Sequence, residues 1–180
     1  TGEALSMLPE GLITELINGV VYDLTSPTVT HQRIAREVFA PLYEHIRAHH
    51  GECEATFAPV DVYIRGDDKQ DCVVPDLIIV CDPDIIRDKG VYGAPDFILE
   101  VLSPSTGLKD KMIKTTLYME TGVREYWMID SKKKELTVYD FTEPRTYVLP
   151  LEGKRGIAIY GGEPEIDLDA IRKIIEGMEK

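Results

Sequence analysis

Long hydrophobic runs and an excess of positive charge are both missing from this sequence. No segment approaches the roughly 18 consecutive apolar residues of a membrane span, and the first residues lack the basic-then-apolar order of a signal peptide. We therefore expect a cytoplasmic protein with no membrane partner. Lysine and arginine total 20 against 32 aspartates and glutamates, which gives a net charge of -12. Because lysine and arginine neutralise phosphates, this composition argues against a strongly basic nucleic-acid groove.

Cysteine is scarce as well. Cys53, Cys72 and Cys81 are odd in number, and no pair has the two-residue spacing of a zinc or redox motif. We do not expect a disulfide framework. We interpret the three residues as free, mostly buried thiols.

The remaining composition is that of an ordinary globular protein. The chain has 180 residues, of which 43% are hydrophobic and 29% charged, and this length is sufficient to bury a core. No repeat, linker or low-complexity segment divides it. We expect residues 1–180 to form a single domain.

Hydrophobic periodicity predicts alternating strands and helices. Residues 12–24 indicate two short strands around Asn18-Gly19, a strong hairpin signal. A helix is predicted from Thr30 to a stop at Gly51, with Pro41 kinking or dividing it. Further strands are predicted at 60–64, 72–81, 96–102, 125–130 and 135–141. One helix is predicted to be capped by Ser105 or Thr106 and to end at Gly122, and a last helix to be capped by Asp167. This order predicts an α/β fold with a mixed central sheet flanked by helices.

Two acids interrupt otherwise apolar strands. Asp76 follows Pro75 in the run 72–81, and Glu100 lies inside 96–102. An unpaired carboxylate is costly to bury, and a hard cation such as Mg²⁺ would compensate two of them. A simpler interpretation remains open, in which each acid lies at an exposed strand end or pairs with an arginine.

The surrounding motifs make the pair more specific. Pro75-Asp76 with Glu100-Val101-Leu102 resembles the PD-(D/E)XK nuclease signature, except that Leu102 stands where the lysine belongs. The longer string resembles the Uma-two family of restriction-endonuclease-like proteins, formerly a domain of unknown function. The matching stretches are Glu15 to Gly19, His31 to Ile34, Ala58 to Val62, Pro75-Asp76, Gly93 to Asp96, Glu100 to Ser105, Lys114 with Tyr118, and Gly122 to Trp127.

The resemblance implies a restriction-endonuclease-like fold in which the site lysine has moved to the helix after the glutamate strand. Lys114 matches that position, four residues before Tyr118. Leu102 and Glu100 share a sheet face, so a helix over that face could bring the ammonium to the same point. The alternative is a solvated helix lysine, as we interpret Lys111.

Other candidate residues carry weaker signals. The resemblance implies that Glu15 holds metal or water and that His31 binds a phosphate or relays a proton, whereas without it the two could be an exposed hairpin acid and a capping histidine. Tyr118, Tyr126 and Trp127 are better explained by core packing than by base stacking. His45, His49 and His50 are typical of a helix C-terminus.

The leading hypothesis is a Mg²⁺-dependent endonuclease, with Mn²⁺ as an alternative metal and DNA as the expected substrate. Asp76 and Glu100 would bind the metal, with help from the Val101 carbonyl, and Lys114 would position the attacking water. The alternatives are an inactive nuclease-fold module that binds nucleic acid or mediates assembly, and a phosphohydrolase of small nucleotides. Because nuclease folds commonly pair to reach both strands, we expect a homodimer.

Overall fold

A six-stranded mixed sheet flanked by helices forms the centre of the molecule. The structure is a computed structural model that describes residues 13–49, 51–67, 70–102 and 108–178, with the backbone alone for 108–110. The central sheet has the order β12-β11-β10-β9-β6-β3, and only β9 and β10 are parallel. These strands are β3 (Glu54–Phe57), β6 (Leu77–Val80), β9 (Phe97–Leu102), β10 (Glu125–Asp130), β11 (Glu135–Asp140) and β12 (Arg145–Pro150). The α/β prediction is confirmed.

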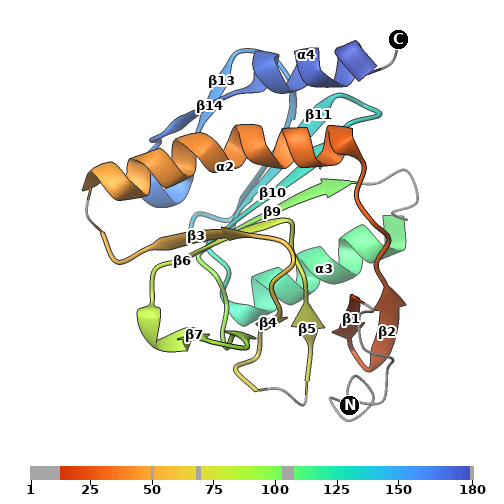
Figure 1. The fold of residues 1–180 in the computed structure, drawn as a ribbon, viewed down its shortest axis with the longest axis vertical. Coiled ribbons are helices and arrows are strands. Elements are labelled where there is room, and N and C mark those ends of the chain that lie inside the picture. Colours follow the sequence, from red (N-terminus) through yellow and green to blue (C-terminus); the bar gives the residue numbers. More distant parts are fainter. Residues whose placement is uncertain (1–12, 50, 68–69, 103–107, 179–180) are drawn as a thin grey trace.

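Helices cover both faces of this sheet (Figure 1). Helices α2 (Val29–His49) and α4 (Leu168–Met178) lie over one face, and α3 (Leu108–Thr121) lies over the other. Side chains alternate along each strand, so β9 contributes Phe97 and Leu99 to the core beneath α2, and Ile98 and Leu102 to the core beneath α3. Glu100 therefore lies on the α3 face, as Leu102 does.

A second sheet carries the N-terminal hairpin. Its order is β2-β1-β5-β4-β8-β7, and its strands are β1 (Thr14–Ile17), β2 (Val20–Asp23), β4 (Val62–Tyr63), β5 (Cys72–Val73), β7 (Ile86–Arg87) and β8 (Gly90–Val91). Asn18 and Gly19 both have positive φ, 51° and 78°, as the predicted turn requires. The hairpin is joined to the rest of this sheet through β1 and β5.

Two predicted elements differ from the structure. Residues 72–81 form two strands, β5 and β6, which belong to different sheets. Pro75, which lacks an N–H, lies in the link between them, where the chain passes from one sheet to the other. Pro41 does not divide its helix, because α2 is one 21-residue helix whose inner face is fixed by buried Val38 and Leu42.

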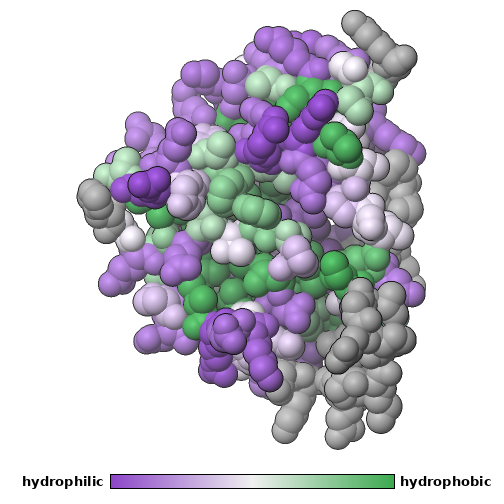
Figure 2. All heavy atoms as spheres, in the orientation of Figure 1, coloured by the Kyte–Doolittle hydropathy of each residue, from purple (hydrophilic) through white to green (hydrophobic). Residues whose placement is uncertain are grey.

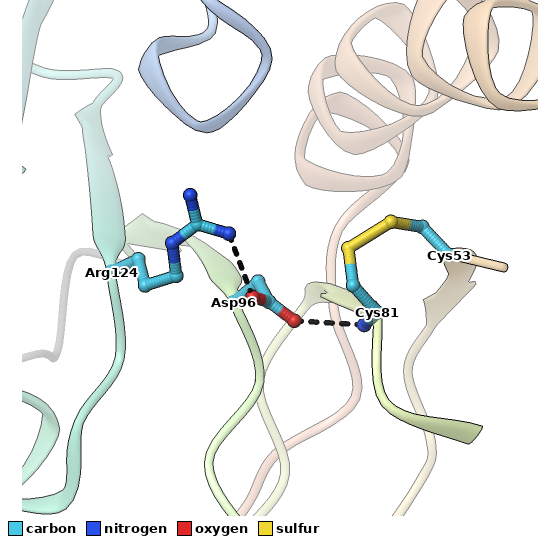
Figure 3. Close-up of a disulfide and its surroundings, with 4 residues drawn as sticks. All are labelled: Cys53, Cys81, Asp96 and Arg124. Atoms are coloured by element: carbon cyan, nitrogen blue, oxygen red, sulfur yellow. Dashed lines mark hydrogen bonds and ion pairs between the residues drawn. A yellow bond between two sulfur atoms is a disulfide. The ribbon is translucent and has the colours of Figure 1, made fainter. Parts of the chain in front are cut away.

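The prediction of three free thiols is wrong. Cys53 and Cys81 form a disulfide (Figure 3). They lie one position beyond the Glu54–Val80 pair of the antiparallel β3–β6 ladder, so the register places them opposite each other. Their separation of 28 residues gave no signal, since β3 was not predicted. Cys72 remains free, and burial, with the nearby Asp61 and Glu15 carboxylates, raises the pKa of its thiol to about 12.

Asp96 forms hydrogen bonds with Cys81 and Arg124 near the disulfide (Figure 3). Its Oδ2 accepts from the Cys81 amide at 2.8 Å, and its Oδ1 accepts from Arg124 Nη1 at 3.0 Å. One acid therefore ties the end of β6 to the starts of β9 and β10. This arrangement fixes the register of the strands that carry Asp76 and Glu100.

The C-terminal part completes the core beneath α2. It contains β13 (Lys154–Gly156), β14 (Glu165–Asp167) and the short 3-10 helix Ala158–Tyr160, besides α4. Asp167 Oδ1 accepts from the Ala170 amide at 2.9 Å, which confirms the predicted cap of α4. Hydrophilic and hydrophobic residues alternate on the visible sides of α2 and α4, whereas hydrophobic residues gather below α2 (Figure 2). No helix within the described ranges is long and apolar enough to cross a membrane.

Candidate active site

Asp76 and Glu100 meet across two neighbouring strands. β6 and β9 pair antiparallel with Leu77 opposite Leu99, so the same register places Asp76 opposite Glu100. Directly opposed side chains have Cβ atoms about 4.5–5.5 Å apart on one face. Asp76 Oδ2 also accepts from the Val101 amide at 2.6 Å. The two acids singled out in the sequence therefore lie side by side.

Lys114 reaches this point from α3. Its Nζ donates to Glu100 Oε1 at 2.8 Å and to Glu15 Oε1 at 2.7 Å, and its side chain is only 16% exposed. Because α3 covers the face that carries Glu100 and Leu102, the helix supplies the ammonium that the strand lacks. The structure therefore places Lys114 at the acids and not in solvent.

Glu15 enters the site from the hairpin. The carboxylate is 3% exposed, and its Oε1 also accepts from the Val74 amide at 2.9 Å. Val74 belongs to the link between β5 and β6 that precedes Asp76. This contact and the ammonium of Lys114 hold the buried carboxylate, so the exposed-hairpin interpretation of Glu15 is wrong.

His31 lies in the first turn of α2 and faces Asp76. Its Nε2 is 3.0 Å from Asp76 Oδ2, and the nearby backbone of Val101 also favours the protonated ring. The other ring nitrogen, Nδ1, is buried without a partner among the described residues. Burial opposes protonation of this imidazole, but Asp76 and Glu100 outweigh burial and raise its pKa. The structure thus brings all six predicted site residues together.

These residues line a cleft of about 590 Å³. Its walls come from the β1–β2 hairpin and the segment after it, the start of α2, the ends of β6 and β9, and α3. Four acids line the cleft: Glu15, Asp23, Asp76 and Glu100. They face three basic side chains: His31, Lys111 and Lys114.

Burial and neighbouring charges shift the pKa values of Glu100 and Lys114 in the cleft. Burial raises the pKa of Glu100 to about 7; Asp76 and Glu15 add to this increase, and Lys114 opposes it. Burial lowers the pKa of Lys114, but the Glu100 and Glu15 carboxylates outweigh burial and raise it well above its usual range. Lys114 therefore carries a permanent charge, and a further cation near Glu100 would be favourable.

Sequence reasoning missed two features of the site. Tyr118 is fully buried, as expected for a core residue, but its hydroxyl also donates to Glu100 Oε1 at 2.9 Å. Its position four residues after Lys114 placed it on the same helix face, and this was the available signal. Lys111, interpreted as a surface lysine, lines the cleft and lies 3.4 Å from Asp130 Oδ2.

Other predictions concern residues outside the cleft. Tyr126 and Trp127 are buried and pack in the core, so the core interpretation is confirmed. Tyr126 also lines the cleft. His45 and His49 lie at the end of α2, with ring centroids 4.1 Å apart, while His50 and the predicted capping residues Ser105 and Thr106 fall outside the described residues.

The donor set bears on whether a metal ion fits. Among the residues that the structure describes, no group of three or more histidine, cysteine, aspartate or glutamate side chains could hold a metal ion. A metal here would therefore depend on two carboxylates and on ligands other than side chains. That is the usual situation of Mg²⁺, which takes one or two carboxylates and completes its shell with water and substrate phosphate. Asp76 and Glu100 fit this chemistry.

Known proteins resemble the chain in sequence and in fold. The Uma2 family model, whose description is "Putative restriction endonuclease", matches residues 3–156. An uncharacterised protein of Synechocystis, slr1290, is 25% identical over 126 residues, which are 69% of this chain and 64% of that protein.

A solved structure supports the same fold. The crystal structure of a "putative nuclease belonging to DUF820" from Anabaena variabilis ATCC 29413 superposes with a TM-score of 0.78. The match covers 97% of this chain and 98% of that one, at 18% sequence identity. At this identity the likeness concerns the fold alone.

Proposed function

We propose that this chain is a divalent-metal-dependent endonuclease that hydrolyses phosphodiester bonds of nucleic acid. The chain belongs to the Uma2 family of restriction-endonuclease-like proteins. One observation carries the proposal. Lys114 reaches from α3 to within 2.8 Å of Glu100, on the strand position opposite Asp76. Two acids and a lysine thus meet in a cleft, although the strand itself offers Leu102 in place of lysine.

Asp76 and Glu100 would hold Mg²⁺ or Mn²⁺, with the Val101 carbonyl as a further oxygen ligand. A bound divalent ion supplies Lewis-acid polarisation of the phosphoryl oxygen and lowers the pKa of an attacking water. Such an ion would also favour the ionised form of Glu100, whose pKa is raised to about 7 by burial and, to a lesser extent, by Asp76 and Glu15. The ion would give the acidic cleft the positive charge that nucleic-acid phosphates need.

Lys114 acts by charge and position in this proposal. Its Nζ donates to Glu15 and Glu100, and these carboxylates favour its protonated form, so we assign it no proton-accepting step. Its role is to orient that water and to stabilise negative charge on the phosphoryl oxygens. Glu15, which shares the ammonium with Glu100, holds Lys114 in place.

His31 supplies a second donor, which faces Asp76. The neighbouring carboxylates favour its imidazolium form, despite the opposing effect of burial. Its Nε2 faces Asp76 and its Nδ1 is buried, so the ring is suited to orient Asp76 and to relay a proton through this carboxylate. We assign His31 this supporting role.

The direct test is cleavage of supercoiled plasmid and of linear DNA and RNA, with Mg²⁺, Mn²⁺ or EDTA. We expect metal-dependent cleavage that Glu100→Ala and Lys114→Ala each abolish. Lys154→Ala is the matched control, since Lys154 pairs with Glu165 on the small β13–β14 sheet. Melting temperatures of all variants establish that each protein is folded.

The outcomes separate the candidate functions. Cleavage that survives both site variants would contradict the proposal. A nuclease-fold module without chemistry would show no cleavage and no Mg²⁺ or Mn²⁺ binding that depends on Asp76, as measured by calorimetry. Hydrolysis of mononucleotides or dinucleotides without cleavage of polymers would indicate a small-nucleotide phosphohydrolase.

A further inference from the structure

We propose that Lys111 binds the phosphate next to the scissile one, so that the cleft takes a nucleic-acid strand and not a single nucleotide. This inference rests on the proposed function and extends it to the substrate class. It starts from a residue that the site described above does not use.

Lys111 differs from the other basic residues of the cleft in its partner. Lys114 is held by Glu15 and Glu100, and His31 is held by Asp76. Lys111 instead contacts Asp130, which is not among the described residues that line the cleft. Its charge is therefore not committed to the proposed metal ligands.

The contact between Lys111 and Asp130 is loose. Lys111 Nζ and Asp130 Oδ2 are 3.4 Å apart, and the two side chains are 19% and 18% exposed. The other oxygen, Oδ1, accepts from the amides of Lys132 and Lys133, both at 3.1 Å. Asp130 thus closes the β10–β11 turn, and this role does not require Lys111. An ammonium has three donors, so Lys111 has donors left for a phosphate.

Spacing connects Lys111 to the scissile phosphate. Lys111 and Lys114 are three residues apart on α3, and such positions have Cβ atoms about 5–6 Å apart on one helix face. Phosphates repeat every 3.4 Å or so of rise along one strand, so two ammonium groups one helical turn apart can serve successive phosphates. A nucleoside monophosphate offers a phosphate to Lys114 alone.

The experiment measures binding of fluorescent single-stranded and duplex oligonucleotides across a salt series, with Ca²⁺ held constant. Losing one phosphate contact lowers the slope of log K against log salt by about 0.7 for a single strand and 0.9 for B-DNA. We expect Lys111→Gln to show this loss and Lys111→Arg to restore the slope. Lys154→Gln, a charge loss at the remote β13–β14 sheet, is expected to leave the slope unchanged.

A reciprocal variant tests the same contact from the other side. Asp130→Asn keeps an oxygen for the turn amides and removes the charge that holds Lys111, so oligonucleotides are expected to bind several-fold more tightly. That gain should vanish when Lys111→Gln is also present. Asp140→Asn is the matched control, because Asp140 Oδ1 accepts from the Thr142 and Glu143 amides and so closes the next turn in the same way. Asp140 pairs with Glu125, at the end of β10 far from Asp130.

The results distinguish this inference from the proposed function. Oligonucleotide binding whose salt slope is the same in Lys111→Gln and Lys154→Gln would overturn the inference alone. The inference also fails if Lys111→Gln weakens competition by a nucleoside monophosphate as much as it weakens oligonucleotide binding. Absence of oligonucleotide binding by the wild-type protein would overturn both.

Discussion

Two glutamates on the neighbouring strands β9 and β10, three register positions apart, show what separates a reactive site from a structural one. Glu100 lies on β9 opposite Met128, and Glu125 begins β10 opposite Phe97. Glu100 faces α3 and the cleft. Glu125 lies two residues before Trp127, on the same face of β10, and Trp127 packs beneath α2. Burial raises the pKa of both carboxyls.

The hydrogen-bond partners of the two glutamates differ in charge and in whether they reach both carboxylate oxygens. Glu125 is 1% exposed and accepts from Trp127 Nε1 at 2.6 Å and from the Ile159 amide at 3.0 Å, so neutral donors reach both of its oxygens. Glu100 is 12% exposed and shares a cation with a second acid. A buried carboxylate alone therefore does not mark a functional site. Open access, unbalanced charge and a shared cation do.

The largest expected difference between the two glutamates is in catalysis. Glu100→Gln should lower the rate of metal-dependent cleavage by at least about 100-fold, as expected when a charged group that acts on the transition state is removed. Glu125→Gln should leave the rate per folded molecule within about threefold. Single-turnover cleavage at saturating Mg²⁺ measures both. An equal loss in the two variants would show that the contrast is not functional.

Stability should show the opposite order. Glu125→Ala leaves the Trp127 indole N–H and the Ile159 amide unpaired in an enclosed site, and we expect the free energy of unfolding to fall by about 2–4 kcal/mol. Glu100→Ala should have a smaller effect, because water in the cleft can replace the lost acceptor for Lys114 and Tyr118. Urea denaturation of both variants at one pH provides the comparison. A greater loss for Glu100→Ala would contradict it.

This contrast also explains what the sequence could and could not reveal. The Asn18-Gly19 turn, the apolar run 96–102 and the Lys114–Tyr118 spacing have local signals, and they predicted the hairpin, β9 and the helix face at the site. Glu125 precedes an apolar run as Asp76 does, and nothing local distinguishes a structural acid from a site acid.

The failures involve contacts that depend on the assembled sheets. The Cys53–Cys81 disulfide requires β3 to pair with β6, and β3 has no clear periodicity. The division of residues 72–81 into β5 and β6 at Pro75 arises because the two strands join different sheets. The Lys111–Asp130 contact joins a helix to a strand end that is distant in sequence. Local patterns carry no information about such pairs.

The gain in stability on metal binding should differ more modestly between variants of the two glutamates. At a free Mg²⁺ or Mn²⁺ concentration ten times its dissociation constant, binding to the folded state adds about 1.4 kcal/mol to the free energy of unfolding. Wild type and Glu125→Gln should both show this gain in thermal unfolding, and Glu100→Gln and Asp76→Asn should not. Stabilisation that persists in Asp76→Asn would place the metal elsewhere.

The smallest expected effect is the pH dependence contributed by Glu125. Burial raises the pKa of this carboxyl above its ordinary value of 4.5, and hydrogen bonds from the backbone and Trp127 only partly oppose the shift. The folded state therefore holds the proton more tightly than the unfolded state. Its contribution to stability is fully present below the unfolded pKa and is lost as pH rises through the folded pKa.

Glu125→Gln has no proton to lose, so it isolates this contribution. The difference in unfolding free energy, wild type minus Glu125→Gln, should decline as pH rises above about 4.5 and then level off. Urea titrations of both proteins across this interval measure the difference, and the acid unfolding common to both cancels. A difference that rises with pH would mean that the neutral donors around Glu125 favour the carboxylate strongly enough to overcome burial. Glu125 would then hold a stable buried charge without any cation, and a shared cation would no longer distinguish Glu100 from it.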